Sequence, residues 1–152
     1  MFGFFFNLLN EYYFNKRYYF YYLCIKKNSE FDKNKLKYQV KGLYPQSFFT
    51  VKNNDTSKVS FDIKKLQPIK DKLNKYWYSN SEKDCYFFQS QYLKFYEKAF
   101  TKYTELDYFN ITLKLFDEFI RNNNLDDKKF DENREIFIPV DIKFKFFKFE
   151  KK

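Results

Sequence analysis

The sequence contains no histidine, and glycine, proline and cysteine are scarce, with 2, 3 and 2 residues in a chain of 152. Without an imidazole the chain cannot form a Ser-His-Asp triad, a Cys-His pair or a histidine-ligated zinc or haem site. Cys24 and Cys85 cannot supply a four-cysteine metal site. Two glycines are too few for a glycine-rich phosphate-binding loop. We therefore expect a protein that is not an enzyme and uses no metal and no cofactor.

Aromatic and basic residues are abundant by contrast. The chain has 23 Phe and 15 Tyr, and its formal net charge is +9. The enriched residue types have AT-rich codons, which predicts a compact, AT-rich genome such as that of an organelle. Aromatic side chains bury large areas, so a core can form. The basic charge is typical of proteins whose partner is a polyanion.

The N-terminal segment, residues 1–27, is the most aromatic part of the chain. It lacks the basic start and the small-residue cleavage site of a signal peptide. Asparagines and charged residues such as Glu11, Lys16 and Arg17 interrupt it, which disfavours a membrane span. We expect residues 1–57 to be an extension that packs on a partner or on RNA, and residues 58–152 to form the folded domain.

Hydrophobic periodicity predicts the elements of this domain. Alternation favours strands at residues 36–41, 59–64, 85–90, 108–115 and 137–149. Helices are expected at residues 68–78 and 125–134, and helical spacing also occurs within residues 91–106. Either of the first two segments can be the first strand. The order after residue 58 is typical of an α+β, ferredoxin-like split βαβ domain.

Lysines and aromatic residues interleave in residues 92–103. Lys94, Lys98 and Lys102 can neutralise phosphates, while Tyr92, Tyr96 and Tyr103 can stack on unpaired bases. An amphipathic segment whose aromatic side chains enter the core explains the pattern equally well. Further candidate RNA-binding residues are Lys114, Arg121, Lys16 and Arg17.

The segment from residue 103 to residue 147 resembles small-subunit ribosomal protein ten. The residues T-E-L-D-Y-F-N-I at 104–111 stand where that family has a strand reading S-R-E-Q-F-E-I. The residues I-P-V-D-I-K-F at 138–144 resemble the family's last motif, without the two residues between its Pro and Val. The resemblance implies a ferredoxin-like domain in the head of the small ribosomal subunit, with residues 91–105 as a loop projecting into RNA.

Together with this resemblance, these observations predict a structural protein of a mitochondrial ribosome, an rRNA-binding ribonucleoprotein of the small subunit that acts in translation. Its expected location is the mitochondrial matrix, bound to the ribosome. Its partners would be ribosomal RNA and neighbouring ribosomal proteins, with no small-molecule substrate and no membrane contact. The alternative is a membrane-anchored accessory subunit of a respiratory-chain complex. An enzyme that uses Asp117 and Glu118 as acid and base is disfavoured, because nothing near them in the sequence would shift their pKa values.

Overall fold

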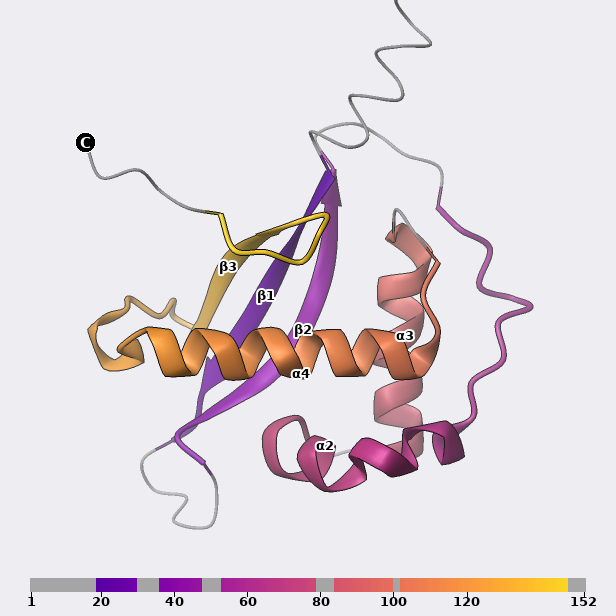
Figure 1. Ribbon diagram of the computed structural model, residues 1–152, viewed down its shortest axis with the longest axis horizontal. Coiled ribbons are helices and arrows are strands. Elements are labelled where there is room, and N and C mark those ends of the chain that lie inside the picture. Colours follow the sequence, from indigo (N-terminus) through magenta and orange to yellow (C-terminus); the bar gives the residue numbers. More distant parts are fainter. Residues whose placement is uncertain (1–18, 30–35, 48–52, 79–83, 100–101, 148–152) are drawn as a thin grey trace, which may run out of the picture.

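The chain folds around a small antiparallel sheet in the computed structural model, which describes residues 19–29, 36–47, 53–78, 84–99 and 102–147. The sheet has three strands in the order β2-β1-β3. They are β1 at Tyr19–Lys27, β2 at Tyr38–Ser47 and β3 at Glu135–Asp141. β1 is the central strand and pairs antiparallel with both neighbours. The first and last strands of the chain therefore lie side by side (Figure 1).

The two faces of the sheet differ in what covers them. Tyr21, Leu23 and Ile25 alternate along β1 and are almost completely buried, as expected for the core-facing side of a strand with period two. Helix α4 crosses this face of the sheet (Figure 1). Phe20 and Tyr22 point to the opposite, outer face and are only half-buried.

A β-bulge interrupts the pairing of β1 with β2. Cys24 pairs with Gly42, whereas the next residue, Ile25, pairs with Val40. Lys41 is therefore the extra residue of the bulge. A bulge re-aims the side chain of its extra residue, and Lys41 is exposed between two buried neighbours.

The remaining elements lie between β2 and β3 in the chain. A 3₁₀ helix, η1, spans Ile63–Ile69 and leads directly into α2 at Lys70–Tyr76. Helix α3 spans Asp84–Lys98, α4 spans Glu105–Asn122, and a short 3₁₀ helix, η2, spans Leu125–Asp127. Helix α3 contacts β2, while η1 and α2 pack against α4. Figure 1 shows α3 beside the β2 edge of the sheet and α2 below α4.

Helix α4 holds the core together. Thr104 caps its N-terminus, because its hydroxyl oxygen accepts a hydrogen bond from the Asp107 amide at 3.2 Å. Tyr108 and Phe109 follow in the first turns and are at most 1 % exposed. Both rings contact the fully buried Trp77, with centroids 5.5 and 4.8 Å away. Aromatic side chains thus supply the interior that the few aliphatic residues cannot fill.

The prediction of a ferredoxin-like fold is wrong, although the α+β class is right. Residues 85–90 lie in α3 and residues 108–115 lie in α4, so two of the expected strands are helical. Residues 59–62 precede η1 without forming a strand. The helix expected at residues 68–78 is present as α2, whereas in residues 125–134 only η2 is helical.

The strands of the described residues also differ from the expectation. β3 begins at Glu135 and ends at Asp141, where a turn reverses the chain before Phe146 bridges back to Val140. β1 and β2, from the expected extension, share one sheet with β3 from the expected domain. The sheet therefore joins both sides of the boundary expected near residue 57. Within the described residues, none of the helices combines the length and the hydrophobicity that a membrane span needs.

Candidate functional site

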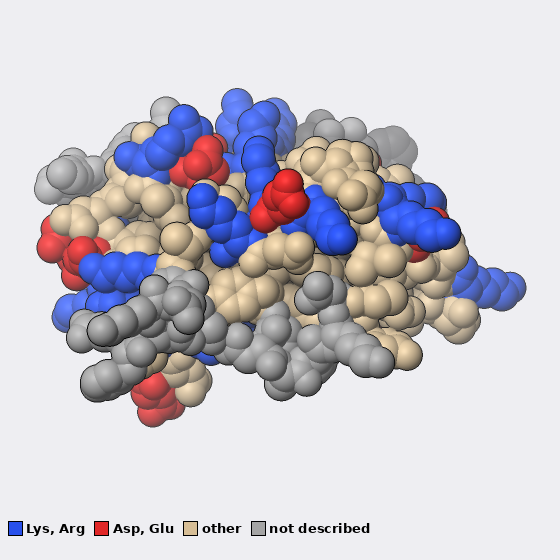
Figure 2. Space-filling view, turned by 90° about the horizontal axis from the view of Figure 1, so that it is seen from below, with Lys and Arg blue, Asp and Glu red and all other residues tan. Residues whose placement is uncertain are grey.

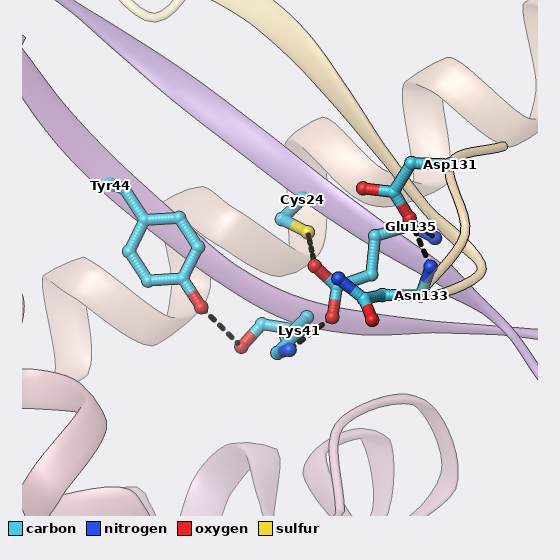
Figure 3. Close-up of polar contacts among 6 residues, drawn as sticks. All are labelled: Cys24, Lys41, Tyr44, Asp131, Asn133 and Glu135. Carbon is cyan, nitrogen blue, oxygen red and sulfur yellow. Dashed lines mark hydrogen bonds and ion pairs between the residues drawn. The ribbon is translucent and has the colours of Figure 1, made fainter.

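An ion pair between β2 and β3 brings reactive side chains from all three strands together. The Lys41 ammonium contacts the Glu135 carboxylate Oε1, and the two residues are 94 positions apart in the sequence. The Glu135 side chain is 10 % exposed, whereas that of Lys41 is 46 % exposed. A buried carboxylate is thus paired with an ammonium group that a ligand can reach (Figure 3).

A tight turn before β3 fixes Glu135. The Asp131 carboxylate Oδ1 accepts hydrogen bonds from the backbone amides of Asn133 at 2.9 Å and Glu135 at 2.8 Å. The Asp131 amide in turn donates to the Glu135 carbonyl at 2.8 Å. Arg134 completes the turn with a φ of 61°, in the left-handed region that residues other than glycine rarely adopt. Glu135 therefore enters the sheet from a rigid backbone.

Cys24 lies beneath this ion pair and is fully buried. Its Sγ donates a hydrogen bond to Glu135 Oε2 at 3.7 Å. Burial, together with the nearby negative charge of Glu135, raises the pKa of the Cys24 thiol to about 12. The thiol therefore stays protonated near neutral pH, where it serves as a weak hydrogen-bond donor and not as a nucleophile.

Tyr44 reaches the same group because residue 42 is glycine. A Cβ on Gly42 would lie 2.7 Å from Cζ and 2.8 Å from the hydroxyl oxygen of Tyr44. The ring thus folds back over the strand, and its hydroxyl donates to the Lys41 carbonyl at 3.4 Å. Burial raises the Tyr44 pKa above its ordinary value, with the Cys24 and Glu135 charges contributing in the same direction. The phenol therefore remains a hydrogen-bond donor over the physiological pH range.

Helix α3 contributes Gln91 to the same place. Its Oε1 lies 3.1 Å from the position of a Cβ on Gly42, and this oxygen is buried without a hydrogen-bond partner among the described residues. The side-chain oxygen of Gln39, which pairs with Lys26 of β1 across the sheet, is also buried and unpartnered. Buried acceptors without partners are costly and rare in folded proteins. Gln39 and Gln91 therefore leave two acceptor oxygens near the bulge, as Trp77 Nε1 leaves an unpartnered donor in the core.

The arrangement combines a proton acceptor with several donors. Glu135 can accept a proton, Lys41 carries a positive charge and a transferable proton, and Tyr44 can donate a hydrogen bond. These are the functions that general acid–base catalysis and anion stabilisation require. No cluster of three or more His, Cys, Asp or Glu side chains suited to a metal ion occurs in the described part of the chain.

A second buried carboxylate with an exposed lysine partner lies elsewhere. Glu105 is 4 % exposed and lies 3.3 Å from Lys65. Glu105 occupies the first turn of α4, where a negative charge stabilises the helix dipole. This pair therefore has a structural explanation, and the group around Glu135 is the stronger candidate.

Comparison with protein families decides the class of protein. Residues 11–136 match the model described as the Ribonuclease T2 family, and this range covers most of the chain. The chain belongs to the ribonuclease T2 family. Members of this family are RNA-cleaving enzymes. The matched residues include every residue of the group around Glu135. No curated protein and no solved structure matches the chain.

Membership of the ribonuclease T2 family corrects the functional predictions. The resemblance to small-subunit ribosomal protein ten is wrong, and so are the predicted ribosomal partners, the respiratory-chain alternative and the conclusion that the chain is not an enzyme. The structure gives the physical reason for the first error. Residues 104–111, expected as a strand, are the capped N-terminus of α4, and residues 91–98 of the expected loop belong to α3.

The residues predicted to bind RNA lie in several places. Lys94 and Lys98 are exposed, four residues apart on one side of α3. The Lys102 ammonium lies 6.0 Å from the centroid of the Tyr96 ring. Lys114 and Arg121 are exposed on α4, and Arg121 pairs with Asp117 at 2.9 Å. Lys16 and Arg17 lie outside the described residues.

The three tyrosines of the predicted stacking segment pack largely inward. Tyr92 is 4 % exposed, and its hydroxyl donates to the Tyr103 carbonyl at 2.6 Å. Its ring therefore has no free face for a base and belongs to the core. Tyr96 and Tyr103 are half-buried, and the Tyr103 ring contacts Phe95 and Phe144. For Tyr92, the structure therefore fits the amphipathic interpretation, in which the aromatic side chains of this segment enter the core, and not stacking on a base.

Sequence reasoning missed every residue of the group around Glu135. Lys41 and Glu135 meet only through the pairing of β1 with both neighbours. One signal was present, since Gly42 directly follows the alternating residues 36–41. The strand β2 continues past it to Ser47, and a glycine within a strand often marks a bulge or a close approach. Charge alone could not have found the group, because on the face seen in Figure 2 lysine and arginine side chains are scattered with acidic residues between them.

Proposed function

We propose that this chain cleaves RNA and that the Lys41–Glu135 pair carries the acid–base chemistry. Family membership supports the reaction. The observation that carries the site is the convergence of a buried carboxylate, an accessible ammonium and a protonated phenol at the bulge of β2. The chain has no histidine, so the proton transfers must use side chains of this kind.

The chemistry of RNA suggests the role of each group. The 2′-hydroxyl of ribose lies beside the phosphodiester and attacks phosphorus once its proton is removed. Glu135 accepts that proton, the bond from O2′ to phosphorus forms, and the bond from phosphorus to O5′ breaks. Lys41 protonates the departing 5′-oxygen and offsets the charge on the phosphoryl oxygens. Positioned acid–base groups of this kind contribute about 10²–10⁴-fold to a rate.

Tyr44 would act by hydrogen bonding. Its raised pKa keeps the phenol protonated, so when RNA binds it can exchange its 3.4 Å hydrogen bond to the Lys41 carbonyl for one to a phosphoryl oxygen that gains charge in the transition state. Such preorganised donors are often the largest single contribution to catalysis. The fold of the ring over Gly42 holds the hydroxyl beside Lys41 before RNA binds.

We also propose that the RNA backbone continues along α3. Lys94 lies one turn beyond Gln91, and Lys98 follows on the same side. Contacts to phosphate make binding weaken steeply as salt rises. Changing Lys94, Lys98 and Lys102 to Glu together should therefore weaken RNA binding and flatten its dependence on salt.

The test is a cleavage assay on the purified full chain with a short single-stranded RNA that carries a fluorophore and a quencher. We expect Glu135→Gln and Lys41→Met each to lower kcat/KM by about 100-fold or more. Lys37→Met is the matched control, because Lys37 immediately precedes β2 and also forms an ion pair, with Asp126, in which both side chains are about half exposed. It should cleave as the unchanged protein does.

Two results would contradict the proposal. Equal activity in the unchanged protein and in Glu135→Gln would show that the cleavage does not depend on this site. The unchanged protein could also bind RNA tightly without cleaving it. Lys41 would then have a role in binding, and Glu135 would have no catalytic role. Thermal unfolding of each variant shows whether a loss of activity reflects a loss of fold.

A further inference from the structure

An exposed aromatic ring lies on the outer face of the sheet, next to the Lys41–Glu135 pair. Phe137 is 45 % exposed, one of the few large hydrophobic residues in the described chain with so much surface. It follows Glu135 by two positions in β3, so both side chains point to the same face. Cys24, which donates to Glu135, is the cross-strand partner of Phe137.

The ring of Phe137 packs against a neighbouring aromatic ring. It makes a T-shaped contact with Tyr22, with centroids 5.9 Å apart and planes at 81°. Tyr22 pairs across β1 and β2 with Tyr44, whose hydroxyl reaches Lys41. The three rings therefore form an aromatic strip, defined as Phe137, Tyr22 and Tyr44, that crosses all three strands beside the ion pair.

Positive charge borders this strip. Lys26 is the cross-strand neighbour of Glu135 in the pairing of β1 with β3, and Lys41 lies at the bulge of β2. Exposed aromatic rings flanked by lysines suit single-stranded nucleic acid, because bases stack on the rings while lysines neutralise phosphates. A hydrophobic protein partner would find the charges at this border unfavourable to bury.

We propose that Phe137 stacks on an unpaired base of single-stranded RNA next to the phosphodiester held by Lys41. This inference rests on the proposed function and assigns the base-binding side of the same site. Successive residues on one face of a strand are about 7 Å apart, so the base bound at Phe137 belongs to a nucleotide that adjoins the one reacting at Glu135. Bases in a duplex cannot use this ring, since their faces are already stacked.

The experiment measures binding and not cleavage. The probe is a fluorescent single-stranded oligoribonucleotide with 2′-O-methyl groups, which has no free 2′-hydroxyl to attack phosphorus. A second probe has the same backbone without bases. We expect Phe137→Leu to weaken binding of the first probe by about 10-fold, as for loss of one stacked base, and to leave binding of the second unchanged. Phe137→Trp should bind the first probe at least as tightly as the unchanged protein.

The control variant is Phe147→Leu, which removes a ring of nearly equal exposure, 46 %, beyond the end of β3 and should bind both probes normally. The proposal is overturned if Phe137→Leu binds both probes normally, or if it weakens both equally. It is also overturned if sedimentation shows that Phe137→Leu abolishes self-association of the chain instead of RNA binding. Failure of the proposed function looks different, because the unchanged protein would then fail to cleave an unmodified single-stranded RNA, whatever Phe137→Leu does to binding of the two probes.

Discussion

Replacing Lys41 by Met tests whether the buried Glu135 carboxylate depends on its ammonium partner. The Glu135 side chain is 10 % exposed, so removal of Lys41 leaves a negative charge that water reaches poorly. Breaking a fully buried ion pair in this way costs about 3–5 kcal/mol. The Lys41 side chain is 46 % exposed, and solvent screening reduces the value of partly exposed pairs. We therefore expect Lys41→Met to lower the free energy of unfolding by about 2 kcal/mol.

The second variant, Glu135→Gln, removes the buried charge and leaves Lys41 in water. Because a neutral amide needs no ammonium partner, the double variant Lys41→Met/Glu135→Gln should be more stable than Lys41→Met alone. Coupling energies of contacting residues are about 0.5–3 kcal/mol. We expect the double variant to recover about half of the loss, or about 1 kcal/mol.

Thermal and urea unfolding followed by circular dichroism measure these differences. For a chain of this size, a loss of about 2 kcal/mol lowers the melting temperature by about 4–8 °C. Lys37→Met should leave the melting temperature unchanged, because both side chains of its pair with Asp126 are half exposed. If the effects of Lys41→Met and Glu135→Gln simply add, the two side chains are not coupled, and the reasoning about the pair is refuted.

Four further predictions concern Gly42, the two cysteines and the Thr104 cap. Gly42→Ala forces the Tyr44 ring off the strand and should destabilise the fold by about 1–3 kcal/mol; urea unfolding should show no such loss in a Tyr44→Ala background, where there is no ring to displace. Iodoacetamide should label the exposed Cys85 at once and Cys24 only after unfolding, as mass spectrometry of the peptides will show. Burial raises the pKa of Cys24 to about 12 from 9.0, so the unfolded thiol ionises first, and the stability present below about pH 9 should decline as pH rises towards 12. Thr104→Ala removes the α4 cap and should lower the free energy of unfolding by about 1 kcal/mol, and a melting temperature equal to that of the unchanged protein would contradict this role.

The errors in predicting the fold have a common physical cause. Phe and Tyr occur so often that periods of two and of 3.6 fit the same segments. In residues 108–115 the alternating Phe109, Leu113 and Leu115 suggested a strand, yet Tyr108, Thr112 and Phe116 are buried with them at helical spacing. The Thr104 cap followed by Asp107 was a local signal for the helix. In β1 the alternation was hidden, because aromatic residues occupy both faces.

The candidate site was beyond local reasoning for a different reason. Lys41, Cys24 and Glu135 come from three strands, and their contacts span 94 and 111 positions of the chain. Register decides such contacts, and a shift of one residue would turn Glu135 to the other face of the sheet. The bulge at Lys41 changes that register within β2, and no sequence pattern fixes where an extra residue is placed. The absence of histidine was read correctly as an exclusion of imidazole chemistry, but it did not exclude catalysis.

The absence of histidine also provides a decisive check on any activity that is measured. Histidine is the side chain whose unperturbed pKa lies near 6.5. A chain without it has no side chain with an ordinary pKa between about 5.5 and 7, so the rate of RNA cleavage should vary little over this range. A steep inflection near pH 6.5 would indicate a contaminating nuclease that uses histidine. If Glu135→Gln abolishes a cleavage activity that is flat across this range, the activity belongs to this chain and to this carboxylate.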